Sequence, residues 1–230
     1  MADKTIVSSN SDTSQISVPA AHLAIGAAVA VPLLLVSLHI LSPEFDPSWR
    51  MVSEYANGQY SWVLSLMFVS WAVGSWASAF AIRSQVKTIG GKIGLGFLIA
   101  AGVGEAMASI FDINNSFHSV SAMIGIPSLP IAAMFISVSL ARSQAWHHAK
   151  KVVLLTANLT WISLVLMAAA MFIMFTGLSQ AGVDLNAGAP ATLPSGVIAL
   201  GGWANRLLIV VYCVWAMSVV WQAIRLQIVK

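Results

Sequence analysis

Residues 152–178 read VVLLTANLTWISLVLMAAAMFIMFTGL, a stretch without a charged side chain. A helix needs about 20 predominantly apolar residues to cross a bilayer, so this stretch alone predicts a transmembrane span. The whole chain has the same character, because 58% of its 230 residues are hydrophobic and only 8% are charged. A soluble domain carries roughly 25% charged residues. The composition therefore predicts an integral membrane protein whose exterior faces lipid.

Five further apolar stretches are long enough to cross a membrane, and short polar loops separate them. These stretches are Pro19–Leu41, Tyr60–Ile82, Ile93–Phe111, Val120–Leu140 and Ile198–Leu226. We therefore predict an all-α, polytopic bundle of six transmembrane helices over residues 19–230. Residues 1–18 are polar and rich in Ser and Thr, which is typical of a disordered tail. The single cysteine, Cys213, excludes an internal disulfide.

The distribution of basic residues among the loops predicts the orientation of the bundle. Short cytoplasmic loops carry an excess of Lys and Arg, and one side of the predicted bundle holds nine of them, against Arg50 and Arg206 on the other. The nine are Lys4, Arg83, Lys87, Lys92, Arg142, Lys150, Lys151, Arg225 and Lys230. Both termini are therefore expected in the cytoplasm. Tryptophans near the span ends fit an aromatic belt, with Trp49, Trp62 and Trp203 outside and Trp146 and Trp221 inside.

Two further patterns concern packing between spans. Small residues recur every four positions in the second span, around Gly74, and in the third span, around Gly104. Such stripes let helix backbones approach closely, so we expect tight packing of these two spans. Pro127 and Pro130 each remove a backbone donor from the fourth span, which predicts an interruption or kink there.

Charged groups within a bilayer are costly and mark functional sites by default. Glu105 lies in the middle of the third span, and Asp112 follows seven residues later on the same expected helical face. His118 opens the fourth span after a short turn. These three side chains are predicted to line one pocket on the outer side.

Other polar residues are predicted at the same depth. Arg206, near the outer end of the sixth span, is the natural partner for Glu105, either within a binding site or as a pair that pins two helices together. His39 lies near the outer end of the first span. The loop that follows adds Ser53 and Glu54 on the same side, and Ser53 fits a helix cap better than a nucleophile, because no GxSxG elbow surrounds it.

The sequence leaves the cofactor unknown. His39, His118 and Asp112 are ligand types that zinc or iron accepts, and the two histidines could in principle hold a haem. The chain has no HExxH motif and no paired histidines at helical spacing within a span. No metal site is therefore predicted. His39, His118 and Asp112 are kept only as minor candidates for metal ligands.

Three segments carry a resemblance to a known family. They are SPEFDPSWRMVSEYANG at 42–58, FDINNSFHSVSAMIG at 111–125 and GGWANRLLIVVYCVW at 201–215. They resemble the bacterial and archaeal membrane-protein family known as domain of unknown function 998. The resemblance implies a six-span bundle in a bacterial or archaeal cytoplasmic membrane, with an outer polar cluster that includes Ser53, Glu54, Asp112, His118 and Arg206. Asn205 stands where many relatives are expected to carry an acidic residue, and the family supplies no established activity.

Three functions therefore remain open. The first is binding of a lipid or small amphiphile in the outer pocket, which the intramembrane Glu105 favours. The second is an accessory subunit of a larger membrane complex with membrane-protein partners. The third is a membrane-embedded lipid-modifying enzyme that uses a carboxylate and His118 for acid–base chemistry. Nucleic acid is not an expected partner, because 11 basic residues spread over short loops form no binding footprint.

Overall fold

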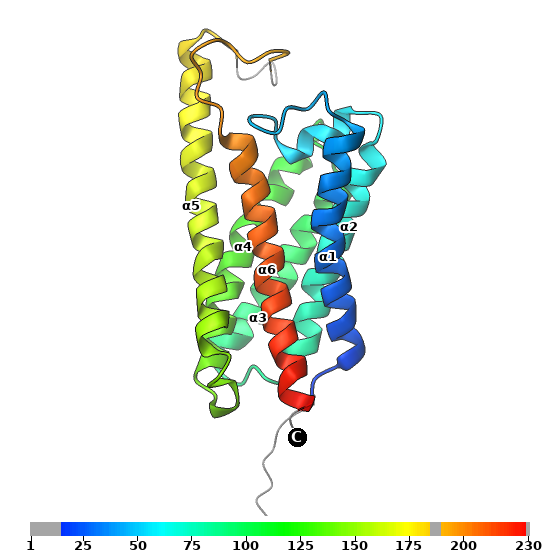
Figure 1. The fold of residues 1–230 in the computed structure, drawn as a ribbon, viewed down its shortest axis with the longest axis vertical. Coiled ribbons are helices and arrows are strands. Elements are labelled where there is room, and N and C mark those ends of the chain that lie inside the picture. The colour runs from blue at the N-terminus through cyan, green and yellow to red at the C-terminus, as the bar shows by residue number, and fades with distance from the viewer. Residues whose placement is uncertain (1–14, 185–189, 229–230) are drawn as a thin grey trace, which may run out of the picture.

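The computed structural model describes residues 15–184 and 190–228, and its regular structure is helical. Six of its helices are long and apolar enough to cross a membrane. They are α1 (Val18–Leu41), α2 (Ser61–Ile82), α3 (Ile89–Ile110), α4 (Phe117–Ala141), α5 (Lys150–Gln180) and α6 (Gly201–Ile228). Figure 1 shows them running alternately up and down as one bundle. The predicted all-α membrane bundle of six spans is confirmed.

The helix ends differ from the predicted spans by a few residues, for identifiable reasons. Helix α3 begins at Ile89, four residues early, because the Thr88 hydroxyl accepts a hydrogen bond from the Gly91 amide (3.0 Å) and caps the helix. Helix α6 begins late, at Gly201. Its first-turn Gly202 amide donates to the Ser48 carbonyl (3.1 Å), which supplies a partner that the helix itself does not offer.

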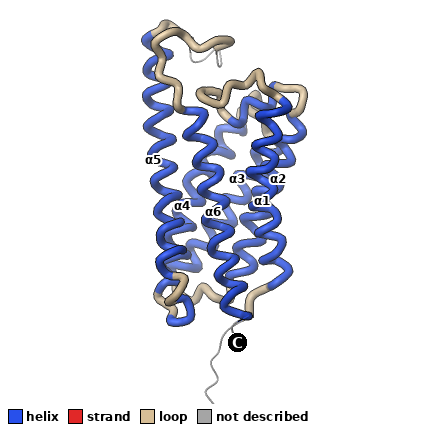
Figure 2. Tube along the Cα trace, in the orientation of Figure 1, coloured by secondary structure: helices blue, strands red, loops and turns tan. Residues whose placement is uncertain are grey.

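The two ends of the bundle differ in charge. We call the end where α1 begins and α6 ends the basic end, because the loops and helix ends there carry Arg83, Lys87, Lys92, Arg142, Lys150, Lys151 and Arg225. The opposite end, here the η1 end, carries Arg50 and Arg206. Its segment between α1 and α2 includes the short 3₁₀ helix η1 (Val52–Asn57), and Figure 2 shows this segment folded over that end.

The expected aromatic belt is only partly formed. Trp62, Trp203 and Trp221 are exposed toward the surroundings of the bundle, as expected. Trp146, in the 3₁₀ helix η2 (Gln144–Trp146), is instead fully buried in the main core. Trp49 is also buried, because it packs at the η1 end against Met174 and Leu178 of α5. The predicted place of these two tryptophans in the aromatic belt was therefore wrong.

The small-residue stripes of the second and third spans do not face each other. A Cβ at Gly74 would lie 3.3 Å from the Ala27 side chain of α1, whereas one at Gly104 would collide with the Gly125 backbone of α4. The stripes therefore join α2 to α1 and α3 to α4. The predicted interruption of the fourth span is absent, because α4 continues as one helix from Phe117 to Ala141 through Pro127 and Pro130.

Most of the predicted tail lies outside the described residues, whereas its boundary with the bundle at residues 18–19 is described, and α1 begins there at Val18. Residues 1–14, which include Lys4, and Lys230 at the other terminus are outside the described residues. Within residues 15–18, Ile16 is buried, and the Gln15 carbonyl accepts a hydrogen bond from the Ser84 hydroxyl (2.8 Å). This short segment is thereby packed against the loop between α2 and α3.

Candidate functional site

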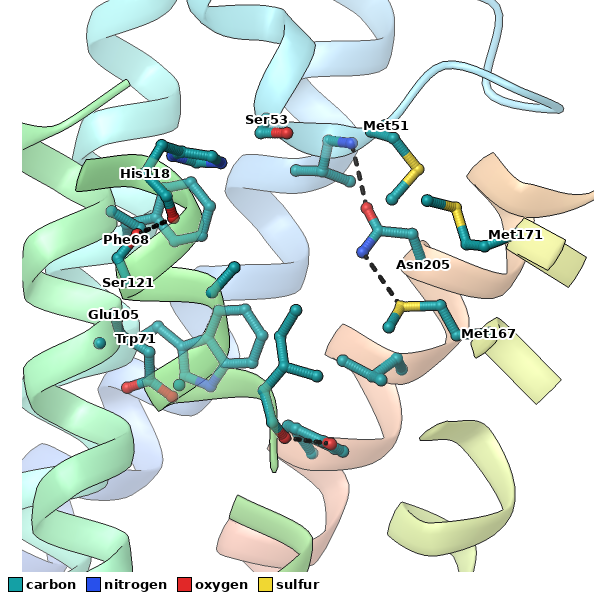
Figure 3. Close-up of a pocket in the computed structure, with 18 residues that line it drawn as sticks. Met51, Ser53, Phe68, Trp71, Glu105, His118, Ser121, Met167, Met171 and Asn205 are labelled. Atoms are coloured by element: carbon teal, nitrogen blue, oxygen red, sulfur yellow. Dashed lines mark hydrogen bonds between the residues drawn. The ribbon is translucent and has the colours of Figure 1, made fainter. Parts of the chain in front are cut away.

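A cavity of about 320 Å³ lies between η1 and helices α2 to α6. Its walls are mostly apolar, with aromatic side chains from α2 and α6 and methionines from α5. Of the predicted site residues, Glu105, His118 and Ser53 line it, whereas Arg206, His39, Glu54 and Asp112 do not. Figure 3 shows Glu105, Ser121 and His118 on one wall and Met167, Met171 and Asn205 on the other.

Glu105 is the acidic residue of this cavity. It lies in the second half of α3, and its side chain is 6% exposed. One carboxyl oxygen accepts a hydrogen bond from the Ser75 hydroxyl of α2 (2.8 Å). The other has no hydrogen-bond partner among the described residues, and the residue lines the cavity. Glu105 therefore enters the cavity with part of its hydrogen-bonding capacity unused.

The pair expected between Glu105 and Arg206 is not formed. The Glu105 carboxyl bonds to a neutral hydroxyl, and the Arg206 guanidinium bonds to groups on α1, α6 and the loop between α1 and α2. The reason lies in the packing order, since α6 packs mainly against α5 and α1 while α3 packs mainly against α4 and α2. Similar depth in the membrane did not place the two residues on facing helices.

His118 lies in the first turn of α4, and its ring lines the cavity. Its Nδ1 is 2.9 Å from the Phe111 carbonyl oxygen. A carbonyl only accepts, so Nδ1 carries the proton, and in the neutral ring Nε2 keeps its lone pair. Nε2 has no partner among the described residues, which makes it a second unused acceptor in the cavity.

Residues 51–53 belong to the segment between α1 and α2 and line the cavity at the η1 end of the bundle. The Val52 amide donates to the Asn205 side-chain oxygen of α6 (3.0 Å), and the Asn205 amide nitrogen is 3.7 Å from the Met167 sulfur. Asn205 thus joins this segment, α5 and α6. The Ser53 side chain is half-buried and faces the cavity.

Sequence reasoning missed three residues of the site, Ser75, Trp71 and Asn205. Ser75 and Trp71 lie four positions apart in α2 and therefore share a face. A serine and a tryptophan in mid-span at that spacing were the available signal. Asn205 was noted only as a departure from the family pattern, although an amide next to an arginine in an apolar helix also marks a polar contact.

A second polar cluster surrounds Arg206, which is 4% exposed. Its Nε donates to His39 Nε2 (2.7 Å), and one terminal nitrogen donates to the carbonyls of Arg50 (2.7 Å) and Gly202 (3.0 Å). The other terminal nitrogen is 3.2 Å from the Tyr55 hydroxyl. All four partners are neutral groups. Arg206 therefore ties α6 to α1 and to the segment that contains η1.

This cluster also determines the state of His39. Nδ1 is 2.7 Å from the Leu35 carbonyl oxygen, so it carries the proton, and the Nε2 lone pair accepts the Arg206 hydrogen bond. Both ring nitrogens are occupied by protein partners, which leaves no lone pair for a metal or a haem. Within the described residues, no three His, Cys, Asp or Glu side chains are grouped as a metal site would require.

Glu54 and Asp112, which were expected in the site, lie outside the cavity. Glu54 accepts hydrogen bonds from the Met51 amide (2.7 Å) and from the Arg50 guanidinium (2.6 Å), so it closes the first turn of η1. Asp112 is exposed and accepts from the Asn114 amide (2.9 Å) in the turn between α3 and α4. Both carboxylates stabilise local backbone structure.

Asp46 adds a charge near the Arg206 cluster. Hydrogen bonds from the Ser48 amide and hydroxyl lower the pKa of this exposed carboxyl, and the positive charge of Arg206 contributes to the same direction. Asp46 is therefore ionised at neutral pH. Its charge lies in the segment between α1 and η1, outside the membrane-spanning helices.

Comparison with known proteins gives the family of the chain. The search of curated proteins and the search of solved structures gave no match. The model of one family covers residues 24–222, which is nearly the whole bundle and both polar clusters. The chain belongs to the family of proteins of unknown function DUF998, as the three quoted segments indicate.

Proposed function

We propose that this membrane protein binds a lipid or another small amphiphile in the cavity between η1 and helices α2 to α6. Small-molecule sites are mostly apolar pockets of roughly 300–1,000 Å³ with a few polar groups that fix the orientation of the ligand. A cavity of about 320 Å³ with aromatic and methionine walls fits this description. An apolar chain would contact those walls, and a polar head would contact the wall that α3 and α4 form.

The observation that carries the proposal is the unused hydrogen-bonding capacity of Glu105 and His118 in one apolar cavity. Buried polar groups cost free energy unless they have hydrogen-bond partners. A membrane-embedded scaffold without a ligand would gain from partners supplied by its own side chains. The two residues instead present acceptors to a shared space, which a bound polar head would satisfy.

We further propose that the basic end faces the cytoplasm and that the η1 end faces outward. The support is the concentration of Lys and Arg at the ends that hold residues 83–92, 142–151 and 225, because cytoplasmic loops carry an excess of basic residues. The family resemblance favours the cytoplasmic membrane of a bacterium or archaeon. The cavity would then lie in the outer half of the bilayer.

Two matched variants test the binding proposal. Ala122→Phe places a large ring on a residue that lines the cavity, whereas Met123→Phe places it on the next residue, which is 76% exposed on the outside of the bundle. The protein is purified in mild detergent, and lipids that co-purify are quantified by mass spectrometry. We expect a retained amphiphile in the parent protein and in Met123→Phe and its loss in Ala122→Phe. Equal retention in all three proteins would refute the proposal.

A lipid-modifying enzyme is the second candidate, and the common cavity of His118 and Glu105 favours it. A neutral imidazole with a free Nε2 is a competent general base. The test is the chemical identity of amphiphiles before and after incubation with the parent protein and with His118→Phe. New products that appear only with the parent protein would support catalysis. An unchanged lipid profile would leave binding as the function.

A further inference from the structure

The hydrogen-bonding inventory of the cavity indicates what kind of head the ligand carries. Glu105 has one carboxyl oxygen without a partner, and His118 has its Nε2 lone pair. Both are acceptors when Glu105 is ionised, and both residues line the same cavity. The Ser53 hydroxyl can accept or donate, and the Trp71 indole N–H is a single donor. A ligand head with several N–H donors satisfies this set better than a phosphate or carboxylate does.

The charges around the cavity favour the same kind of head. Glu105 is its acidic residue, and no lysine or arginine of the described residues lines it. The two cations at this end of the bundle, Arg50 and Arg206, do not line the cavity, and the hydrogen bonds that they donate go to groups outside it. A carboxyl in an apolar cavity lacks the counter-charge that would make its ionised form inexpensive. A positively charged head would supply this counter-charge.

Aromatic rings that line the same cavity as Glu105 add a third, independent attraction for a cation. Phe68, Trp71 and Tyr212 line the cavity. The rings of Phe68 and Trp71 are stacked with centroids 6.3 Å apart, and Trp71 meets Tyr212 edge to face at 6.2 Å. Tryptophan is the aromatic residue whose face attracts cations most strongly. Trp71 and Glu105 line the same cavity, and both are labelled in Figure 3.

We propose that the cavity selects amphiphiles with a protonated amine head, which pairs with the Glu105 carboxylate on the side of the cavity that the Trp71 ring also lines. This inference rests on the proposed function, because it assigns the class of the ligand that the same cavity binds. Charge-assisted hydrogen bonds to the carboxylate fix the head, and the alkyl chain lies along the methionine-rich wall of α5. Anionic heads are disfavoured by repulsion from Glu105.

Three twelve-carbon amphiphiles test this selectivity, since they share one tail and differ in the charge of the head. They are dodecylammonium, dodecanol and dodecyl sulfate. Each is titrated into the purified protein in a non-ionic detergent, and the number of molecules bound per protein is measured by native mass spectrometry. An alkylamine is cationic at pH 7, because its pKa resembles that of lysine, about 10.4. We expect dodecylammonium to bind at least about tenfold more tightly than dodecanol, and dodecyl sulfate to bind least.

Variants of Glu105 separate the role of the charge from that of the fold. Glu105→Gln keeps the size and an acceptor but removes the charge, so the preference for dodecylammonium should fall to about twofold or less while dodecanol binding stays. Glu105→Asp keeps the charge and should keep a preference. Glu44→Gln is the control, because it removes the same charge from an exposed residue of the loop after α1.

The outcomes distinguish this inference from the binding proposal. A preference for dodecylammonium that disappears in Glu105→Gln and persists in Glu44→Gln supports both. Equal binding of the three amphiphiles, blocked by Ala122→Phe, overturns the charge selectivity and leaves the amphiphile site standing. A preference for dodecyl sulfate has the same consequence. Binding of none of the three, with or without Ala122→Phe, overturns both.

Discussion

Arg206 of the last transmembrane helix donates its Nε–H to Nε2 of His39 on the first, over 2.7 Å. The contact closes the bundle at the η1 end, because α1 and α6 are neighbours there and the segment between α1 and α2 packs over both. A buried guanidinium is normally expected beside a carboxylate. Here its neighbours are an imidazole, a phenol and two carbonyls, which makes each of them important for stability.

Replacing His39 tests this arrangement. His39→Phe leaves the Arg206 Nε–H buried without an acceptor, so the free energy of unfolding should fall by about 1–3 kcal/mol. His39→Gln offers an amide oxygen and should recover part of the loss. The measurement is a denaturation curve in detergent. His22→Phe, on an exposed position of the same helix, is the control, and equal stability of the two Phe variants would contradict the assigned role of His39.

Gly202→Ala tests how the segment around Arg50 is held on α6. A Cβ at Gly202 would collide with the Pro47 carbonyl oxygen and lie 2.7 Å from that of Arg50. Both obstacles are backbone atoms, so the segment must move. We expect a lower midpoint of thermal unfolding and faster proteolysis within residues 42–57. Gly96→Ala, where no atom lies within 4 Å of the new Cβ, should be neutral or slightly stabilising in its helix.

Gly104 and Gly125 face each other across α3 and α4, yet the two positions should respond differently to alanine. A Cβ at Gly104 would collide with the Gly125 backbone, whereas a Cβ at Gly125 would lie 3.6 Å from the nearest atoms. Gly104→Ala should therefore separate the helices beside the cavity and destabilise the protein by about 1–3 kcal/mol, as overpacking does. Gly125→Ala should be tolerated. Similar unfolding midpoints for the two variants would show that the helices do not pack this closely.

Cysteine labelling tests the proposed orientation. In a Cys213→Ala background, Gln59→Cys places a thiol in the loop at the η1 end, and Lys87→Cys places one in the loop between α2 and α3; both positions are exposed. A membrane-impermeant maleimide applied to intact cells should label residue 59 and leave residue 87 unlabelled until the cells are lysed. Labelling of residue 87 but not of residue 59 in intact cells would show that the orientation is the reverse of the proposed one. The cavity would then lie in the inner half of the bilayer.

The six spans were predictable because length and apolarity alone specify a membrane helix. The partners of each helix were not, since lipid is as apolar as leucine and small-residue stripes do not state which helix they contact. Gly104 illustrates this: its spacing predicted close packing correctly in kind, but the neighbour is Gly125 of α4 rather than a residue of α2.

In the candidate site, too, the sequence predicted some of the residues correctly but did not predict which residues are neighbours. Glu105 and His118 were singled out from cost and position, and the structure places both at one cavity. Asp112 was added by extending the helical period, but α3 ends at Ile110, so that period does not reach residue 112. The Glu105–Arg206 pair was inferred from depth alone. The depth of a residue in the membrane does not define its angular position around the bundle. Glu105 and Arg206 differ in this angular position, because their helices are not neighbours.

The hydrogen bonds of residues 48–55 with Gly202, Asn205 and Arg206 also set an order for biosynthesis. The bonded residues are separated by about two-thirds of the chain, because the Val52 amide binds Asn205, 153 residues later, and the Arg50 carbonyl binds Arg206, 156 residues later. A chain emerges from its N-terminus onward. The segment that lines the cavity nearest η1 therefore obtains these partners only when the sixth helix inserts, so the cavity is completed late in synthesis.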